Sequence, residues 1–143
     1  MSEGPSRLKL EWLPGRYAVC RLEPHEAIPN WAINGLEQDR LVSVTRTADE
    51  LSIVIDEDAA PEHVRCERGF AAMRIAGTLD FALVGVLAKL TNALANASIP
   101  VFVISTFDTD LLLVRAAQTG AAYEALKKVA EIQPITQRPR GVP

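Results

Sequence analysis

The sequence predicts an α+β fold in which antiparallel sheets carry helices on one face. Three observations lead to this prediction. Several short segments alternate apolar and polar residues with the period of two that a half-buried strand requires. Longer segments repeat apolar residues with helical spacing, and two stretches of the chain resemble each other. The 143 residues, 48% of them hydrophobic and 23% charged, are enough to bury a sizeable core.

The first part of the chain is expected to form strands around one short helix. Leu8, Leu10 and Trp12 alternate with charged neighbours, which is typical of a strand with one buried face. Two later runs are rich in β-branched residues, and the short polar link between them favours a hairpin. The expected elements are strands at 8–12 and 16–22, a helical turn at 31–36, and strands at 41–47 and 51–55.

The second part of the chain gives clearer signals. Asp80 is a favourable N-cap, so a long helix is expected to begin there. Its buried face is predicted by four leucines at helical spacing, which are Leu83, Leu87, Leu90 and Leu94. The expected elements are a strand at 71–76, this helix, strands at 101–105 and 110–114, and a helix at 121–129. The first residues of the tail that begins at Gln133 can add at most an edge strand.

An internal repeat divides the chain. Residues 42–55 align with residues 101–114, and each segment is expected to form a hairpin that follows a strand and a helix. Two βαββα units with bare sheet faces are expected to pair and close a shared core. The acidic, proline-containing stretch before Gly69 is the best boundary. The expected organisation is a degenerate module at 1–66, a complete module at 67–133 and a disordered tail at 134–143.

Charge and hydropathy exclude two classes of partner. The net charge of −3 lacks the basic footprint of a nucleic-acid binder. The most apolar stretch, residues 81–90, is far shorter than the roughly 20 residues that span a bilayer. The two cysteines are too few and too far apart to predict a disulfide framework, and the N-terminus lacks the apolar core of a signal peptide. We therefore expect a cytoplasmic protein with no nucleic-acid or membrane partner.

No motif of catalysis or metal binding stands out. The sequence contains no nucleophile elbow, phosphate loop or metalloprotease motif, so we expect no enzyme activity and no cofactor. Cys20, His25, His63 and Cys66 form the one metal-type set, but their spacing is irregular for zinc, so no metal site is expected. Each of the four is explained more simply alone, the cysteines as small buried apolar residues.

The residues from Ala76 to Val114, AGTLDFALVGVLAKLTNALANASIPVFVISTFDTDLLLV, resemble the ACT domain in its amino-acid-sensing form. LEPHEAIPNWA and LVSVTRTADELSIVI in the first half resemble the N-terminal module of small tandem-ACT bacterial proteins. Such proteins are similar to the regulatory tails of aspartate kinases and to CASTOR-type arginine sensors. The resemblance implies two ferredoxin-like (βαββαβ) ACT modules in tandem and a small-molecule sensor. The sequence departs from the best-known ACT architectures, because it shows no attached kinase, hydroxylase or dehydrogenase domain.

The resemblance also implies where an effector binds. In the family, the effector contacts the loop between the first strand and the first helix of a module, and also the facing strand. In the second module of this chain, the loop corresponds to Gly77, Thr78, Leu79, Asp80 and Phe81. The facing strand corresponds to Ile99, Pro100, Val101 and Phe102. Glycine lets the backbone approach a ligand, helix-start N–H groups accept a carboxylate, and Asp80 can pair with an ammonium group. The alternative is a tight strand-to-helix connection in which Asp80 is only a cap.

The partners follow from this interpretation. We expect an amino acid or a similar metabolite as ligand, a homodimer, and a further protein that receives the signal. The alternative is a non-catalytic dimerisation or interaction module with no ligand. The polar residues of the second hairpin turn leave a similar choice, because they can line a pocket or only stabilise the turn; they are Ser105, Thr106, Asp108 and Asp110.

Overall fold

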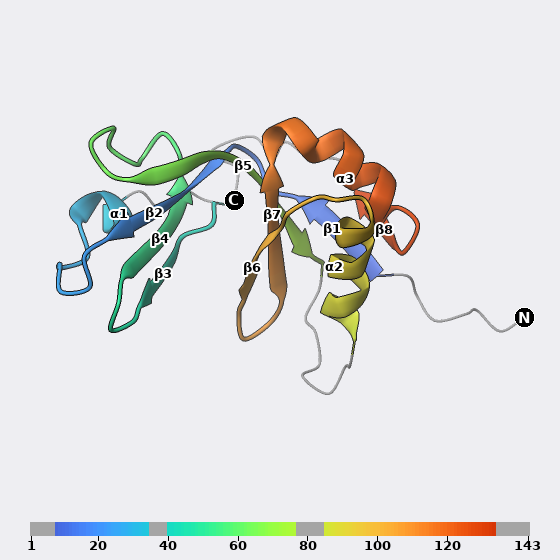
Figure 1. The fold of residues 1–143 in the computed structure, drawn as a ribbon, viewed down its shortest axis with the longest axis horizontal. Coiled ribbons are helices and arrows are strands. Elements are labelled where there is room, and N and C mark those ends of the chain that lie inside the picture. Colours follow the sequence, from blue (N-terminus) through green and yellow to red (C-terminus); the bar gives the residue numbers. More distant parts are fainter. Residues whose placement is uncertain (1–7, 35–39, 77–84, 134–143) are drawn as a thin grey trace, which may run out of the picture.

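The computed structural model describes residues 8–34, 40–76 and 85–133, and its elements form one curled sheet with helices beside it (Figure 1). The strands are β1 (Leu8–Trp12), β2 (Tyr17–Leu22), β3 (Ser43–Arg46), β4 (Leu51–Asp56), β5 (Cys66–Ile75), β6 (Phe102–Ser105), β7 (Asp110–Arg115) and β8 (Ala130–Gln133). The helices are α1 (Asn30–Asn34), α2 (Val86–Asn96), the 3-10 turn η1 (Ala116–Gln118) and α3 (Thr119–Leu126). The mixed α+β class predicted from the sequence is confirmed.

One long strand, β5, joins two halves of the sheet. Met73 pairs with Trp12 of β1 on one edge and with Leu112 of β7 on the other. Near the start of β5, Phe70 likewise lies between Tyr17 of β2 and Arg115 of β7. The first half therefore runs β3-β4-β2-β5, and the second half runs β6-β7-β5-β1-β8. All of these pairs are antiparallel except β1 with β8.

The expected strands lie close to their predicted positions, but β5 is longer than expected. The sequence predicted a strand only from Ala71, whereas β5 begins at Cys66. Because the side chains of Glu67, Arg68 and Gly69 show no alternation of apolar and polar residues, the sequence predicted a boundary here and not a strand. They nevertheless continue the strand, since the backbone of this stretch pairs with β2, with Val19 opposite Glu67. The division at 66/67 stays a prediction, and β1 of the first segment pairs within the second half.

The long helix differs from its prediction in start and in face. It begins at Val86 after Gly85, whose φ of 82° lies in the left-handed region and interrupts a right-handed helix. The N-cap of α2 is thus Gly85, and the predicted cap, Asp80, lies outside the described residues, as does Leu83. The buried face consists of Val86, Leu90, Ala93 and Leu94, the i, i+4, i+7, i+8 pattern. Leu87 is only half-buried and lies outside this set.

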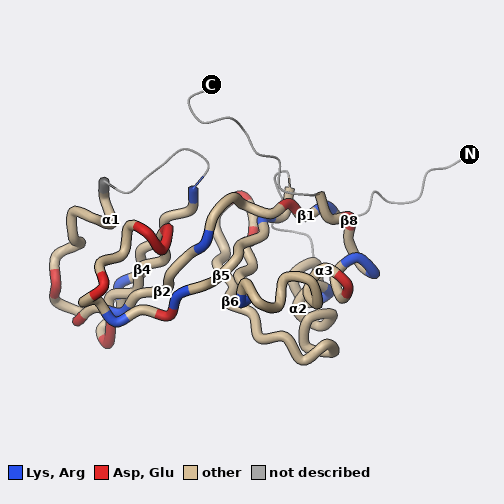
Figure 2. Tube along the Cα trace, turned by 90° about the horizontal axis from the view of Figure 1, so that it is seen from above, with Lys and Arg blue, Asp and Glu red and all other residues tan. Residues whose placement is uncertain are grey.

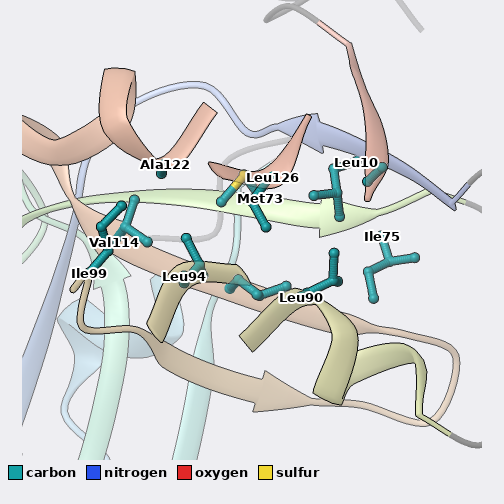
Figure 3. Packing of buried hydrophobic residues seen from close by; sticks show 11 residues of the cluster. Leu10, Met73, Ile75, Leu90, Leu94, Ile99, Val114, Ala122 and Leu126 are labelled. Atoms are coloured by element: carbon teal, nitrogen blue, oxygen red, sulfur yellow. The ribbon is translucent and has the colours of Figure 1, made fainter. Parts of the chain in front are cut away.

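Three apolar clusters fill the molecule. The second-half core lies between the sheet and helices α2 and α3, and Figure 3 shows its packing. It contains Leu10, Met73, Ile75, Leu90, Leu94, Ile99, Leu112, Val114, Ala122, Leu126 and Ala130. The first-half core contains Ala18, Cys20, Ala32, Leu51, Ile53, Ile55 and Ala60. The shared core contains residues of both halves, namely Tyr17, Val54, Ala72, Leu111 and Leu113, with Phe70 and Phe102 against it.

The shared core arises from the alternation of strand residues. On β7, Leu112 and Val114 belong to the second-half core, whereas Leu111 and Leu113 belong to the shared core. Side chains of successive strand residues point to opposite faces, so the sheet is apolar on both faces here. A sheet with one face covered by helices buries its second face against the other half.

The two hairpin turns share two hydrogen bonds. The Thr47 N–H donates to the Glu50 carbonyl at 2.9 Å, and the Glu50 N–H donates to the Thr47 hydroxyl at 3.2 Å. In the other turn, the Thr106 N–H donates to the Thr109 carbonyl at 2.8 Å, and the Thr109 N–H donates to the Thr106 hydroxyl at 3.2 Å. Thr47 and Thr106, which are aligned in the repeat, therefore stabilise their turns in the same way.

Charged residues of both signs are interspersed along both halves of the described chain (Figure 2). The segment from Gly85 to Phe107 is an exception, since Lys89 is its one charged residue. Within the described ranges, no helix has the length and apolar character that a bilayer crossing requires.

Candidate functional site

The predicted ligand site falls into two parts. The residues 77–81, which carry the expected glycine and acid, lie outside the described residues. The remaining four, residues 99–102, are described and lie at the carboxyl end of α2 and the start of β6. Their surroundings explain why each residue is found there.

Ile99 completes the end of α2. Ser98 has a φ of 60°, its N–H donates to the Ala95 carbonyl at 2.9 Å, and the Ile99 N–H donates to the Leu94 carbonyl at 2.9 Å. This pair of bonds defines a Schellman motif, which usually has glycine where this chain has Ser98. The motif also brings together the side chains of Leu94 and Ile99, both in the second-half core. Pro100 follows and is exposed.

The next two residues face opposite sides of the sheet. Val101 packs against the second-half core, whereas Phe102 packs against the shared core. The described part of the predicted set therefore does not line one surface. Ile99 lies beside Leu94 and Val114 in Figure 3, while Ile75 lies toward the opposite end of α2. The 11 residues of α2 span about 16 Å at roughly 1.5 Å per residue.

The end of β5 is the described region that adjoins residues 77–81 in the chain. The Ala76 N–H donates to the Lys9 carbonyl at 2.9 Å, which secures this end to β1. On the other side, the Thr109 hydroxyl donates to the Ile75 carbonyl at 2.9 Å, which secures it to the β6–β7 turn. We call this region, with the amino end of α2, the β5-end site. Figure 1 shows that α2 begins at the same end of the second half as the β6–β7 turn.

The amino end of α2 has properties that suit a carboxylate. The N-cap residue of α2 is Gly85, which has no side chain that could cap the helix, and the first turn contains no acidic residue. The first N–H groups of a helix have no partner within it and carry a partial positive charge, so they favour anions. A Cβ at Gly85 would meet no atom of the described residues within 4 Å, and Gly85 is exposed.

The polar residues of the β6–β7 turn first serve the turn. The Ser105 hydroxyl donates to Asp110 Oδ1 at 2.5 Å, and the Thr106 hydroxyl donates to the Thr109 carbonyl at 3.0 Å. Asp108 is exposed. The sequence left open whether these residues line a pocket or only stabilise the turn. Their described contacts are those of a turn. The sequence gave no indication that Thr109 reaches β5, because that contact spans 34 residues.

A second polar cluster lies in the first half. Arg40 Nη1 is 2.8 Å from Asp56 Oδ2 and donates to the Pro14 carbonyl at 3.0 Å. The buried Tyr17 hydroxyl accepts a hydrogen bond from the Leu41 N–H at 3.2 Å, and burial raises the pKa of this phenol above its usual value. Arg40 lies where a Cβ at Gly15 would stand, and Gly15 has a φ of 87°. The groups of this cluster satisfy one another, so its role is to close the shared core.

The structure brings together two residues that the sequence treated as independent. Cys20 and Cys66 are directly opposite in β2 and β5, and their Sγ atoms are 2.6 Å apart. Spacing in the sequence gave no indication of this, because 46 residues separate them. His25 and His63, the rest of the metal-type set, do not join them: among described residues no three His, Cys, Asp or Glu side chains are grouped to hold a metal ion.

Family models and a solved structure of another protein match this chain. Residues 65–128 match a family model described as the ACT domain, and residues 15–63 match a model described as an N-terminal domain. A structure of an Agobacterium tumefaciens protein is 36% identical with a TM-score of 0.84, and the match covers 94% of this chain and 98% of that one. No curated protein matches the chain.

More distant structures share the fold. A Vibrio cholerae protein, described as of unknown function and a possible transport protein, is 20% identical with a TM-score of 0.70, over 87% of this chain and 91% of that one. The ligand-free regulatory subunit of aspartate kinase from Thermus thermophilus is 16% identical with a TM-score of 0.57, over 87% and 97%. At these identities the likeness concerns the fold.

Proposed function

This chain contains an ACT domain at residues 65–128, and on that premise we propose that it is a regulatory protein that binds a small molecule, an amino acid in particular. The premise rests on the family model described as the ACT domain, which matches residues 65–128. We propose further that it has two ACT-type modules in tandem. The matching turns at Thr47 and Thr106 support this arrangement.

The β5-end site is the proposed place of binding. The observation that carries this proposal is the amino end of α2 within an ACT-type unit, where the N-cap residue is a glycine without a side chain. The N–H groups of this helix end would bind the carboxylate of the ligand. Of the sequence-predicted residues, Gly77, Thr78, Leu79, Asp80 and Phe81 precede this helix in the chain, and Asp80 is proposed to pair with the ammonium group. Residues 99–102 are proposed as its support.

The protein is proposed to act without catalysis, in the cytoplasm, as a homodimer that signals through a partner protein. A ligand-responsive module without catalytic activity of its own passes its signal to another protein. A ligand would act by its differential affinity for two states of the module or its dimer. The alternative, an interaction module with no ligand, predicts a dimer that ignores amino acids.

A thermal-shift screen against each of the twenty amino acids tests the proposal. At one hundred times its Kd a ligand adds about 2.7 kcal/mol of stability. For a domain of this size that raises the Tm by about 5–10 °C. One amino acid, or a chemically related few, is expected to give this shift. An absence of any shift at millimolar concentrations, with a dimer unchanged on size exclusion, would support the ligand-free alternative.

The site is tested with a matched pair of variants. Asp80→Ala is expected to remove most of the shift, because the ammonium group loses its partner. Asp49→Ala removes an acid from the exposed β3–β4 turn of the first half and is expected to leave the shift intact. Equal loss in both variants, or in neither, would contradict the assignment of Asp80.

A further inference from the structure

The two cysteines form a cross-strand pair at the joint between the halves. Cys20 belongs to the first-half core and Cys66 packs against that core, so both side chains lie on the same face of the sheet. The Arg21 N–H donates to the Arg65 carbonyl at 2.9 Å, which makes the neighbouring pair the hydrogen-bonded one. Cys20 and Cys66 therefore occupy a non-hydrogen-bonded position, where opposite Cα atoms are closest, about 4.5 Å apart.

This position suits a disulfide. A disulfide needs Cα atoms about 4.4–6.8 Å apart and an S–S bond of about 2.05 Å. The Sγ atoms are already 2.6 Å apart, so bonding needs only a small adjustment of two side chains. No strand has to move, because the register already sets the two residues opposite each other.

The two thiols differ in access. Cys20 is 1% exposed, and its burial raises the pKa of its thiol to about 12. Cys66 is partly exposed at the start of β5. Oxidants react with an accessible sulfur, so attack begins at Cys66 and the buried Cys20 is the resolving partner.

We propose that Cys20 and Cys66 form a reversible, peroxide-sensitive disulfide that links β2 to β5. The Cys66 sulfur attacks one peroxide oxygen, the O–O bond breaks, and Cys66 becomes a sulfenic acid as the first water leaves. The Cys20 sulfur then attacks the Cys66 sulfur. The S–S bond forms, the S–O bond breaks, and the departing hydroxide takes the Cys20 proton as a second water. The two thiols lose two electrons in total, and hydrogen peroxide is reduced to two waters. A small thiol restores the reduced pair by exchange.

The bond would fix the strand that both halves share. β5 pairs with β2 at its start and with β1 and β7 farther along. A link between Cys20 and Cys66 closes a loop containing most of the first half, and such a cross-link restricts the unfolded chain. Oxidation is thus expected to stabilise the joint without a change of register. This inference is independent of the proposed ligand.

The test exposes the reduced full-length chain to hydrogen peroxide and follows the intact mass. The chain is expected to lose the mass of two hydrogens as a monomer, to lose both alkylatable thiols, and to regain them with dithiothreitol. The Tm is expected to rise by about 5–10 °C on oxidation. Covalent dimers, or added oxygen without loss of hydrogen, would overturn the proposal.

Single-thiol variants test the order of the steps. Cys20→Ala leaves Cys66 alone and is expected to gain one oxygen, since no resolving thiol remains. Cys66→Ser leaves the buried Cys20 alone and is expected to keep its mass under the same exposure. The reverse pattern would contradict the assignment of Cys66 as the attacking residue.

A shifted pair tests the register. Cys20→Ala combined with Leu22→Cys places the thiol two residues along β2 on the same face, away from the position opposite Cys66. Circular dichroism checks that this variant folds. It is expected to lose no hydrogen under the exposure that oxidises the wild type. Equally fast cross-linking would show that register does not determine the bond.

Discussion

The two halves of the molecule share a strand plan but differ in what covers it. In the first half, the five-residue α1 is the helix that packs beside the sheet, together with the loop that contains Ala60. In the second half, α2 and α3, with 11 and 8 residues, cover the sheet. The second half therefore buries a larger helix-packed core, whereas the first half depends on its pairing with β5 and on the shared core. The same hairpin can be kept in place by its own helices or by a neighbouring unit.

The largest effect is expected in the second-half core. Leu90→Ala removes a fully buried side chain between α2 and the sheet, which typically costs about 2–5 kcal/mol of unfolding free energy. Urea denaturation measures it. Leu87→Ala is the matched control, three residues earlier on the same helix and outside the core. It is expected to cost less than about 1 kcal/mol, since half-buried positions lose less burial.

Equal costs for Leu90→Ala and Leu87→Ala would contradict the observed face of α2. They would favour the pattern first expected from the sequence, in which Leu87 and Leu90 share one buried stripe. The two variants thus separate the structure from the sequence-based prediction.

A smaller effect concerns the shared core at high pH. Burial raises the pKa of Tyr17 above 10.0, so the unfolded chain loses this proton first as the pH rises. The stabilising contribution of the neutral phenol is complete below pH 10 and falls as the pH rises toward the folded pKa. The slope is at most about 1.4 kcal/mol per pH unit. Denaturation of Tyr17→Phe from pH 9 to 11 is expected to show a shallower loss than the wild type. Parallel curves would contradict the burial of Tyr17.

The smallest effects are expected in the two hairpin turns. Thr47→Val and Thr106→Val each remove a hydroxyl that accepts a backbone N–H in the turn. Each is expected to cost about 0.5–1.5 kcal/mol. Similar values in urea denaturation would support the equivalence of the two turns. A cost confined to one turn would show that the repeat does not extend to its energetics.

Most strands could be predicted from local pattern alone. The alternation at Leu8, Leu10 and Trp12 placed β1 with its observed bounds, and apolar runs on either side of a short polar turn located both hairpins. The α+β class followed from these signals, because a half-buried strand imposes its period on the side chains.

Other features depend on contacts that no local pattern records. The start of β5 is polar and contains Gly69, and only the backbone of β2 makes it a strand. The first residues of the chain pair in the second half, between β5 and β8, which the order of elements did not indicate. The meeting of Cys20 with Cys66 likewise follows from the β2–β5 register. The start of α2 after Gly85 was not predicted, because the sequence favoured Asp80 as the helix cap.

The candidate ligand site stays a prediction, and the sequence indicated its region more clearly than its position. The resemblance to ACT domains pointed to the region after β5, which the family match at 65–128 includes. The resemblance did not show that residues 99–102 lie at the carboxyl end of α2, away from its amino end, because that separation depends on the length of the helix. The Schellman motif at Ser98 was also hidden, since glycine is the usual residue there.

The most direct test of the central claim is hydrogen exchange on the full chain with and without a saturating mixture of the twenty amino acids. The claim is that the second half binds an amino acid at the β5-end site. The first-turn amides of α2 and those of the β6–β7 turn are expected to become protected. The β3–β4 turn should stay unchanged. No change in any segment, or protection confined to the first half, would contradict the claim.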